Sequence, residues 1–140
     1  MMRHFFVCLI MMTLMMGFSM NASAQRGFED FSREEGLHIQ YRWQRASFFD
    51  KNSDAVLVMR VTNLTEKPLQ VTFAIGFYEN QMILFQNRDN QICLKPGQSL
   101  RGAPAGLRFG ADGITLDQAR GEDFTFDIFD LKVKEVESCK

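Results

Sequence analysis

Apolar and polar side chains alternate along two neighbouring stretches in the middle of the chain. In residues 55–63 one parity holds Leu57, Met59 and Val61, and in residues 69–78 it holds Leu69, Val71, Phe73, Ile75 and Phe77. A period of two is typical of strands that bury one face. Asn63 and Pro68 bound the polar stretch between the two runs. We therefore predict a β-hairpin over residues 55–78.

Shorter runs predict the remaining strands. We expect them at residues 37–44, 82–85, 91–94, 99–109 and 124–133, with a kink at the glycines of the fourth and a bulge near Phe129-Asp130. Trp43 ends the apolar face of the first of these, so we expect it to anchor the core. Only residues 116–120 have helical character, before Gly121. The pattern predicts an all-β fold, an immunoglobulin-like antiparallel β-sandwich of about seven strands.

The first residues have the composition of an export signal. Arg3 precedes an apolar run over residues 5–18, and Ala22-Ser23-Ala24 has the small-x-small pattern of a cleavage site. We predict a signal peptide over residues 1–24, a periplasmic or secreted product, and no membrane insertion after cleavage. Residues 25–36 are polar and lack a sustained period, so we interpret them as a lead-in segment. Residues 37–140 then form the β-sandwich domain.

Two cysteines, Cys93 and Cys139, remain after the predicted cleavage. An even number of cysteines in an exported chain indicates a disulfide, because the compartments outside the cytoplasm permit oxidation. Two alternatives stay open at this point. Cys93 is a buried free thiol beside a disordered Cys139, or the chain end forms an intermolecular bridge.

Charge and composition limit the chemistry. The chain has 16 basic and 17 acidic residues and a formal net charge of −1, so we expect no nucleic-acid partner. His38 is the single histidine after cleavage, which excludes zinc sites with two or three histidine ligands. No G-x-S-x-G motif accompanies it. We therefore predict a protein that is not an enzyme, with no catalytic residues, no cofactor and no metal.

The outward parity of the predicted hairpin is apolar. It carries Val56 and Val58, and Tyr78 stands at its end. One explanation is that another segment, such as residues 28–31, covers this face. The other is that Val56, Val58 and Tyr78 form a candidate surface for a partner.

Four short segments in the middle of the chain occur in an order that is also found in a known group of domains. They are Val61-Thr62-Asn63-Leu64-Thr65, Lys67-Pro68-Leu69, Phe77-Tyr78-Glu79-Asn80 and Leu94-Lys95-Pro96-Gly97-Gln98-Ser99. This order resembles bacterial immunoglobulin-like envelope domains of the FxLyD and CARDB kind over residues 37–109. The resemblance implies an extracytoplasmic accessory or interaction module without family-wide catalytic residues.

We therefore expect a non-enzymatic module that binds an unidentified protein partner or assists the cell envelope. The alternatives are a binder of a small ligand or glycan and a secreted inhibitor of a hydrolase. The oligomeric state stays open, because a long terminal strand can also pair with the edge of a neighbouring molecule.

Overall fold

The computed structural model describes residues 27–140, so the predicted signal peptide lies outside the described residues. Alternating side chains build eight strands, and the turn at Gly102 to Gly106 and the predicted helical stretch each form a short helix. The elements in chain order are β1 (Glu29–Glu34), β2 (Leu37–Arg45), β3 (Asp54–Asn63), β4 (Leu69–Glu79), β5 (Met82–Leu94), β6 (Ser99–Arg101), the 3-10 helix η2 (Ala103–Ala105), β7 (Arg108–Thr115), α2 (Leu116–Ala119) and β8 (Phe124–Glu135).

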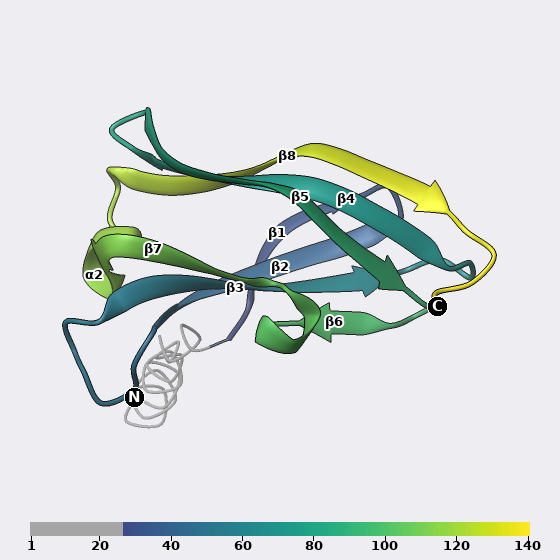
Figure 1. The fold of residues 1–140 in the computed structure, drawn as a ribbon, viewed down its shortest axis with the longest axis horizontal. Helices are drawn as coiled ribbons and strands as arrows, with labels where there is room; N and C mark the ends of the chain where they lie inside the picture. Colours follow the sequence, from purple (N-terminus) through teal and green to yellow (C-terminus); the bar gives the residue numbers. More distant parts are fainter. Residues whose placement is uncertain (1–26) are drawn as a thin grey trace, which may run out of the picture.

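Two antiparallel sheets lie face to face (Figure 1). The larger, sheet A, has the order β1-β2-β3-β6, and β7 also pairs with β3. The smaller, sheet B, has the order β5-β4-β8. The predicted all-β antiparallel sandwich is therefore confirmed. It has eight strands rather than about seven. Strand β1 is added at the edge of sheet A, the strands expected at residues 82–85 and 91–94 form the single strand β5, and the strand expected at residues 99–109 is divided between β6 and β7.

The core lies between the two sheets and uses the predicted parity. Leu57, Ile75 and Phe77 are each at most 1% exposed. The ring of Trp43 lies 5.5 Å from that of Phe77 and 5.6 Å from that of Phe124, so the predicted aromatic anchor is confirmed. Burying one face of each sheet is the main favourable contribution to such a fold.

The predicted hairpin over residues 55–78 is wrong. Strand β3 pairs with β2, β6 and β7, whereas β4 pairs with β5 and β8, so the two strands belong to different sheets. The polar connection carries the chain across the sandwich. Asn63, the last residue of β3, fixes the path of this connection. Its side chain is fully buried, and Nδ2 donates to the carbonyls of Lys67, Leu94 and Lys95.

Bulges in β1 and β5 explain two further differences from the predicted strands, and a bulge in β8 agrees with the prediction. The register of β1 against β2 shifts between Asp30 and Ser32, which hides the period of two in the segment interpreted as a lead-in. Strand β5 continues through residues 87–90, between the strands expected at 82–85 and 91–94, and a bulge with Asp89 at φ 63° lies there. The predicted bulge in β8 is confirmed, since Asp130 has φ 53° where the register against β4 shifts.

The predicted disulfide between Cys93 and Cys139 is present. Cys93 lies near the end of β5, and Cys139 lies in the tail that follows β8. Because β4 lies between β5 and β8, the bond ties the two outer strands of sheet B together. The tail is also held by Val136 N, which donates to Pro68 O at 3.0 Å.

We expect Gly36→Ala to lower the free energy of unfolding by more than the roughly 1 to 2 kcal/mol that a left-handed backbone costs a residue with Cβ, because the added Cβ also clashes with Thr65. Gly36 has φ 77°, and an added Cβ would lie 2.4 Å from Cγ2 of Thr65. The matched control is Gly97→Ala, which has φ 70° and nothing within 4 Å of the added Cβ. Urea unfolding of both variants separates backbone strain from the clash. Equal losses would show that Thr65 yields freely.

Candidate functional site

The outward face of sheet A gathers arginine side chains from five strands. Residues directly opposite each other in an antiparallel pair share a face. Val58 lies opposite Arg42 of β2 and Arg108 of β7, and Arg60 lies opposite Arg101 of β6. Arg33 of β1 lies opposite His38, which is on the same face of β2 as Arg42. We call the surface defined by Arg33, Arg42, Arg60, Arg101 and Arg108 the arginine face.

The arginine face has few carboxylates. Asp30 of β1 lies on it, Asp112 lies on the same parity of β7 as Arg108, and Asp54 lies on the same parity of β3 as Val58. Within residues 27–140 the ion pairs are His38 with Asp30 and Lys67 with Glu135, so no arginine of this face has a carboxylate partner. A face of five arginines and three carboxylates is positive, although the chain as a whole has a net charge of −1.

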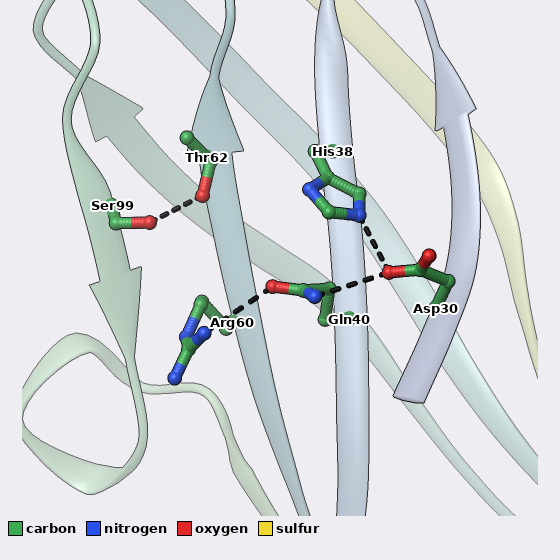
Figure 2. Close-up of polar contacts among 6 residues, drawn as sticks. All are labelled: Asp30, His38, Gln40, Arg60, Thr62 and Ser99. Carbon is green, nitrogen blue, oxygen red and sulfur yellow. Dashed lines mark hydrogen bonds and ion pairs between the residues drawn. The ribbon is translucent and has the colours of Figure 1, made fainter. Parts of the chain in front are cut away.

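Polar side chains connect across this face from strand to strand (Figure 2). Asp30 Oδ1 accepts hydrogen bonds from His38 Nε2 at 2.7 Å and from Gln40 Nε2 at 3.1 Å. Gln40 Oε1 in turn accepts from Arg60 Nη1 at 3.4 Å. The hydroxyls of Thr62 and Ser99 bond to each other at the β6 side. These contacts orient Arg60 without neutralising its charge, because its partner is an amide.

The hydrogen bonds from His38 and Gln40 hold the pKa of the Asp30 carboxyl below its ordinary value of 3.8. A carboxyl with a lowered pKa in the folded state stabilises the fold above its unfolded pKa and loses that contribution as the pH falls through its folded pKa. We expect Asp30→Asn to lower the unfolding midpoint near neutral pH and to leave it unchanged in strong acid. Urea unfolding across this pH range measures the effect, with Asp112→Asn as the control on the same face. An equal difference at every pH would contradict this account.

An aromatic ring lies among the arginines. The guanidinium carbon of Arg60 is 4.0 Å from the centre of the Phe28 ring, and that of Arg42 is 4.8 Å from it. Cation–π contacts of this kind fix a guanidinium while leaving its charge available. Phe31, the other aromatic residue of the segment expected to cover this face, points inward instead, with its ring 5.2 Å from that of Phe126.

The structure does not bring the three residues of the sequence-predicted partner surface together. Val56 and Val58 lie on sheet A, and Tyr78 lies on sheet B. Val56 and Val58 are 3% and 5% exposed, so they offer almost no apolar surface. Tyr78 is half-buried and its ring folds over Gly76, where an added Cβ would lie 2.8 Å from the tyrosine oxygen.

Exposed apolar side chains gather at one end of the sandwich. Phe48 and Phe49 lie in the loop between β2 and β3, and Met82 to Phe85 begin β5 after the turn from β4. Figure 1 shows both connections at the end of the sandwich where α2 lies. The alternation of side chains along the sequence predicts no role for this end. The arginine face was missed as well, although Arg42 and Arg60 stand at outward parity in strands that the pattern does predict.

Within residues 27–140 no three His, Cys, Asp or Glu side chains are grouped as metal ligands, and no helix is long and apolar enough to cross a membrane. Comparisons with protein-family models, with curated proteins and with solved structures find no match. The resemblance to FxLyD and CARDB domains therefore stays a prediction. The fold and site define a disulfide-linked antiparallel β-sandwich with an arginine-rich sheet face.

Proposed function

We propose that this chain is an exported, non-enzymatic binding module that recognises an acidic protein partner through the arginine face. The observation that carries the proposal is the set of five arginines on one sheet face, none of them paired with a carboxylate within residues 27–140. Guanidinium groups bind carboxylates in a planar, two-bonded geometry that lysine does not reproduce. A partner that presents aspartate and glutamate side chains therefore complements this face.

Composition favours a protein as the partner. The face combines arginine with the Phe28 ring, and arginine and aromatic residues are enriched at protein interfaces. Of the eight arginines in residues 27–140, only Arg88 lies on a strand of sheet B. The net charge of −1 provides no long-range attraction for a nucleic acid. The disulfide supports export, since such bonds persist in oxidising compartments.

The proposal is tested with an oligoglutamate peptide carrying a fluorescent label, with fluorescence anisotropy as the readout. We expect the triple variant Arg60→Gln, Arg101→Gln and Arg108→Gln to weaken binding at least about tenfold, or about 1.4 kcal/mol. Arg101 lies opposite Arg60, and Arg108 lies opposite Val58, the next residue along the same face of β3. Their charges therefore act on the same ligand. Binding should also weaken as salt is added, because exposed charges are screened.

The matched control removes an equal number of positive charges from sheet B. It combines Arg88→Gln, Lys132→Gln and Lys134→Gln, all on β5 or β8. We expect this variant to bind the peptide as the unchanged protein does. Equal loss in both variants would reduce the effect to net charge and contradict the proposal. Tighter binding of a sulfated glycan than of the peptide would favour the glycan-binding alternative instead.

A further inference from the structure

Strand β2 extends beyond its neighbour β1. The last pair between them joins Glu29 to Tyr41, whereas β2 continues to Arg45 and stays paired with β3 throughout. Within residues 27–140, the last four residues of β2, Arg42–Arg45, therefore have a strand on one side only. We call this stretch the open edge of β2.

The backbone groups of the open edge point outward at alternate residues. Ala46 N donates to Asp54 O at 2.8 Å, so the pair of Ala46 and Asp54 exchanges ladder hydrogen bonds. In an antiparallel ladder such pairs alternate with pairs that turn their N–H and C=O groups away. Trp43 and Arg45 therefore direct these groups away from β3. In agreement with this geometry, Arg120 Nη2 reaches Trp43 O at 3.4 Å.

The other exposed edges are irregular. The ladders of β5, β8, β1 and β7 each contain a register shift, and β6 has three residues. Bulges and short strands are the usual protection of a sheet edge against pairing with another chain. Strand β2 pairs with β3 over nine residues without a shift. Among the strands of the described residues, the open edge of β2 is therefore the exposed edge with a regular ladder.

Two hollows adjoin the open edge, and Glu29, Trp43 and Arg120 line both. The first, about 350 Å³, is walled by aromatic side chains that include Tyr41, Phe124 and Phe126. The second, about 810 Å³, is lined by Arg42, Arg45, Arg108 and Arg120. One carboxylate, Glu29, lines these hollows, and its Oε2 accepts a hydrogen bond from the Tyr41 hydroxyl at 2.8 Å.

We infer that the open edge of β2 binds an extended segment of the partner as an added β-strand in which acidic and apolar residues alternate. Successive side chains of a strand point to opposite faces. The apolar ones then enter the aromatic hollow on the face of Trp43, and the carboxylates meet Arg42 and Arg108 on the opposite face. In this mode the backbone hydrogen bonds supply affinity and the two hollows supply specificity. The inference rests on the proposed acidic partner, and Arg42 and Arg108 belong to both surfaces.

The test is amide hydrogen exchange followed by nuclear magnetic resonance, with a capped heptapeptide of alternating Glu and Val as the probe. In the free protein we expect the amides of Trp43 and Arg45 to exchange quickly, and with peptide to slow by at least about tenfold. The control peptide has the same composition with its four Glu before its three Val. It carries the same charge but has no alternation, so it should not slow these two amides.

A pair of variants at one position separates the backbone from the charge. Arg45→Gln removes a guanidinium, whereas Arg45→Pro also removes the outward amide, and proline is tolerated at an edge because no ladder bond is lost there. We expect about a threefold loss of heptapeptide affinity in the first and more than about tenfold in the second. Thermal unfolding of both variants checks that they fold. Equal affinities would overturn strand addition.

The outcomes distinguish this inference from the proposed function. If the triple variant loses oligoglutamate binding but the heptapeptide slows neither amide, the acidic partner stands and strand addition is wrong. If both amides are already protected in the free protein, residues before Gly27 cover the edge, and the inference is also wrong. If neither peptide binds, the proposed function itself is contradicted.

Discussion

Replacing both Cys93 and Cys139 by serine is expected to lower the free energy of unfolding by about 4 kcal/mol, the loop-closure entropy for this spacing. The two cysteines are 46 residues apart, and the bond closes a loop that contains β6, β7 and β8. Small domains have a net stability of about 5 to 15 kcal/mol, so the loss is a large share of the total. Guanidinium unfolding of the variant and of the oxidised protein measures it.

The single variant Cys139→Ser is the control for changes in side-chain packing. It opens the same loop but leaves Cys93, which is half-buried on β5, in place. We expect nearly the same loss from the single and the double variant, because the entropy of the unfolded chain is the same in both. A midpoint unchanged by either substitution, together with two alkylatable thiols in the mature protein, would contradict a disulfide inside the chain.

The alternation of side chains predicted which residues are buried but not which strands pair. Leu57 and Phe77 point inward as the period of two requires. The sequence nevertheless predicts a single hairpin for their strands, because Asn63 and Pro68 are typical turn residues. A polar turn between two strands is equally compatible with a crossing between sheets. Burial of the Asn63 side chain distinguishes the two, and it depends on the carbonyls of Leu94 and Lys95, about thirty residues further along the chain.

The arginine face shows the same limit at the level of the site. Arg42 and Arg60 lie at outward parity, so their exposure follows from the pattern. Their approach to Arg101 and Arg108 follows from the register of β3 against β6 and β7, which depends on contacts distant in sequence. The predicted surface of Val56, Val58 and Tyr78 assumed one hairpin face. Once β3 and β4 separate into two sheets, that face no longer exists.

Asn63→Ala is expected to lower the free energy of unfolding by about 3 kcal/mol or more, because several buried hydrogen bonds worth about 1 kcal/mol each are lost. Nδ2 donates to Lys67 O at 2.7 Å and to the carbonyls of Leu94 and Lys95, both at 3.2 Å. Oδ1 accepts from the amide of Thr65 at 2.9 Å and from its hydroxyl at 2.7 Å. One side chain thus joins the crossing between the sheets to the end of β5.

Two further variants show whether these bonds or the side-chain volume cause the loss. Asn63→Asp keeps the volume but places a carboxylate against three carbonyl oxygens, so we expect it to destabilise at least as much as alanine. Asn90→Ala removes a half-buried amide with two bonds of 3.2 Å, to Phe73 O and Asn87 O, and should cost about 1 kcal/mol. Urea unfolding ranks the three variants. An aspartate variant as stable as the unchanged protein would show that the donor bonds of Asn63 do not hold the crossing, since only the amide can donate to those carbonyls.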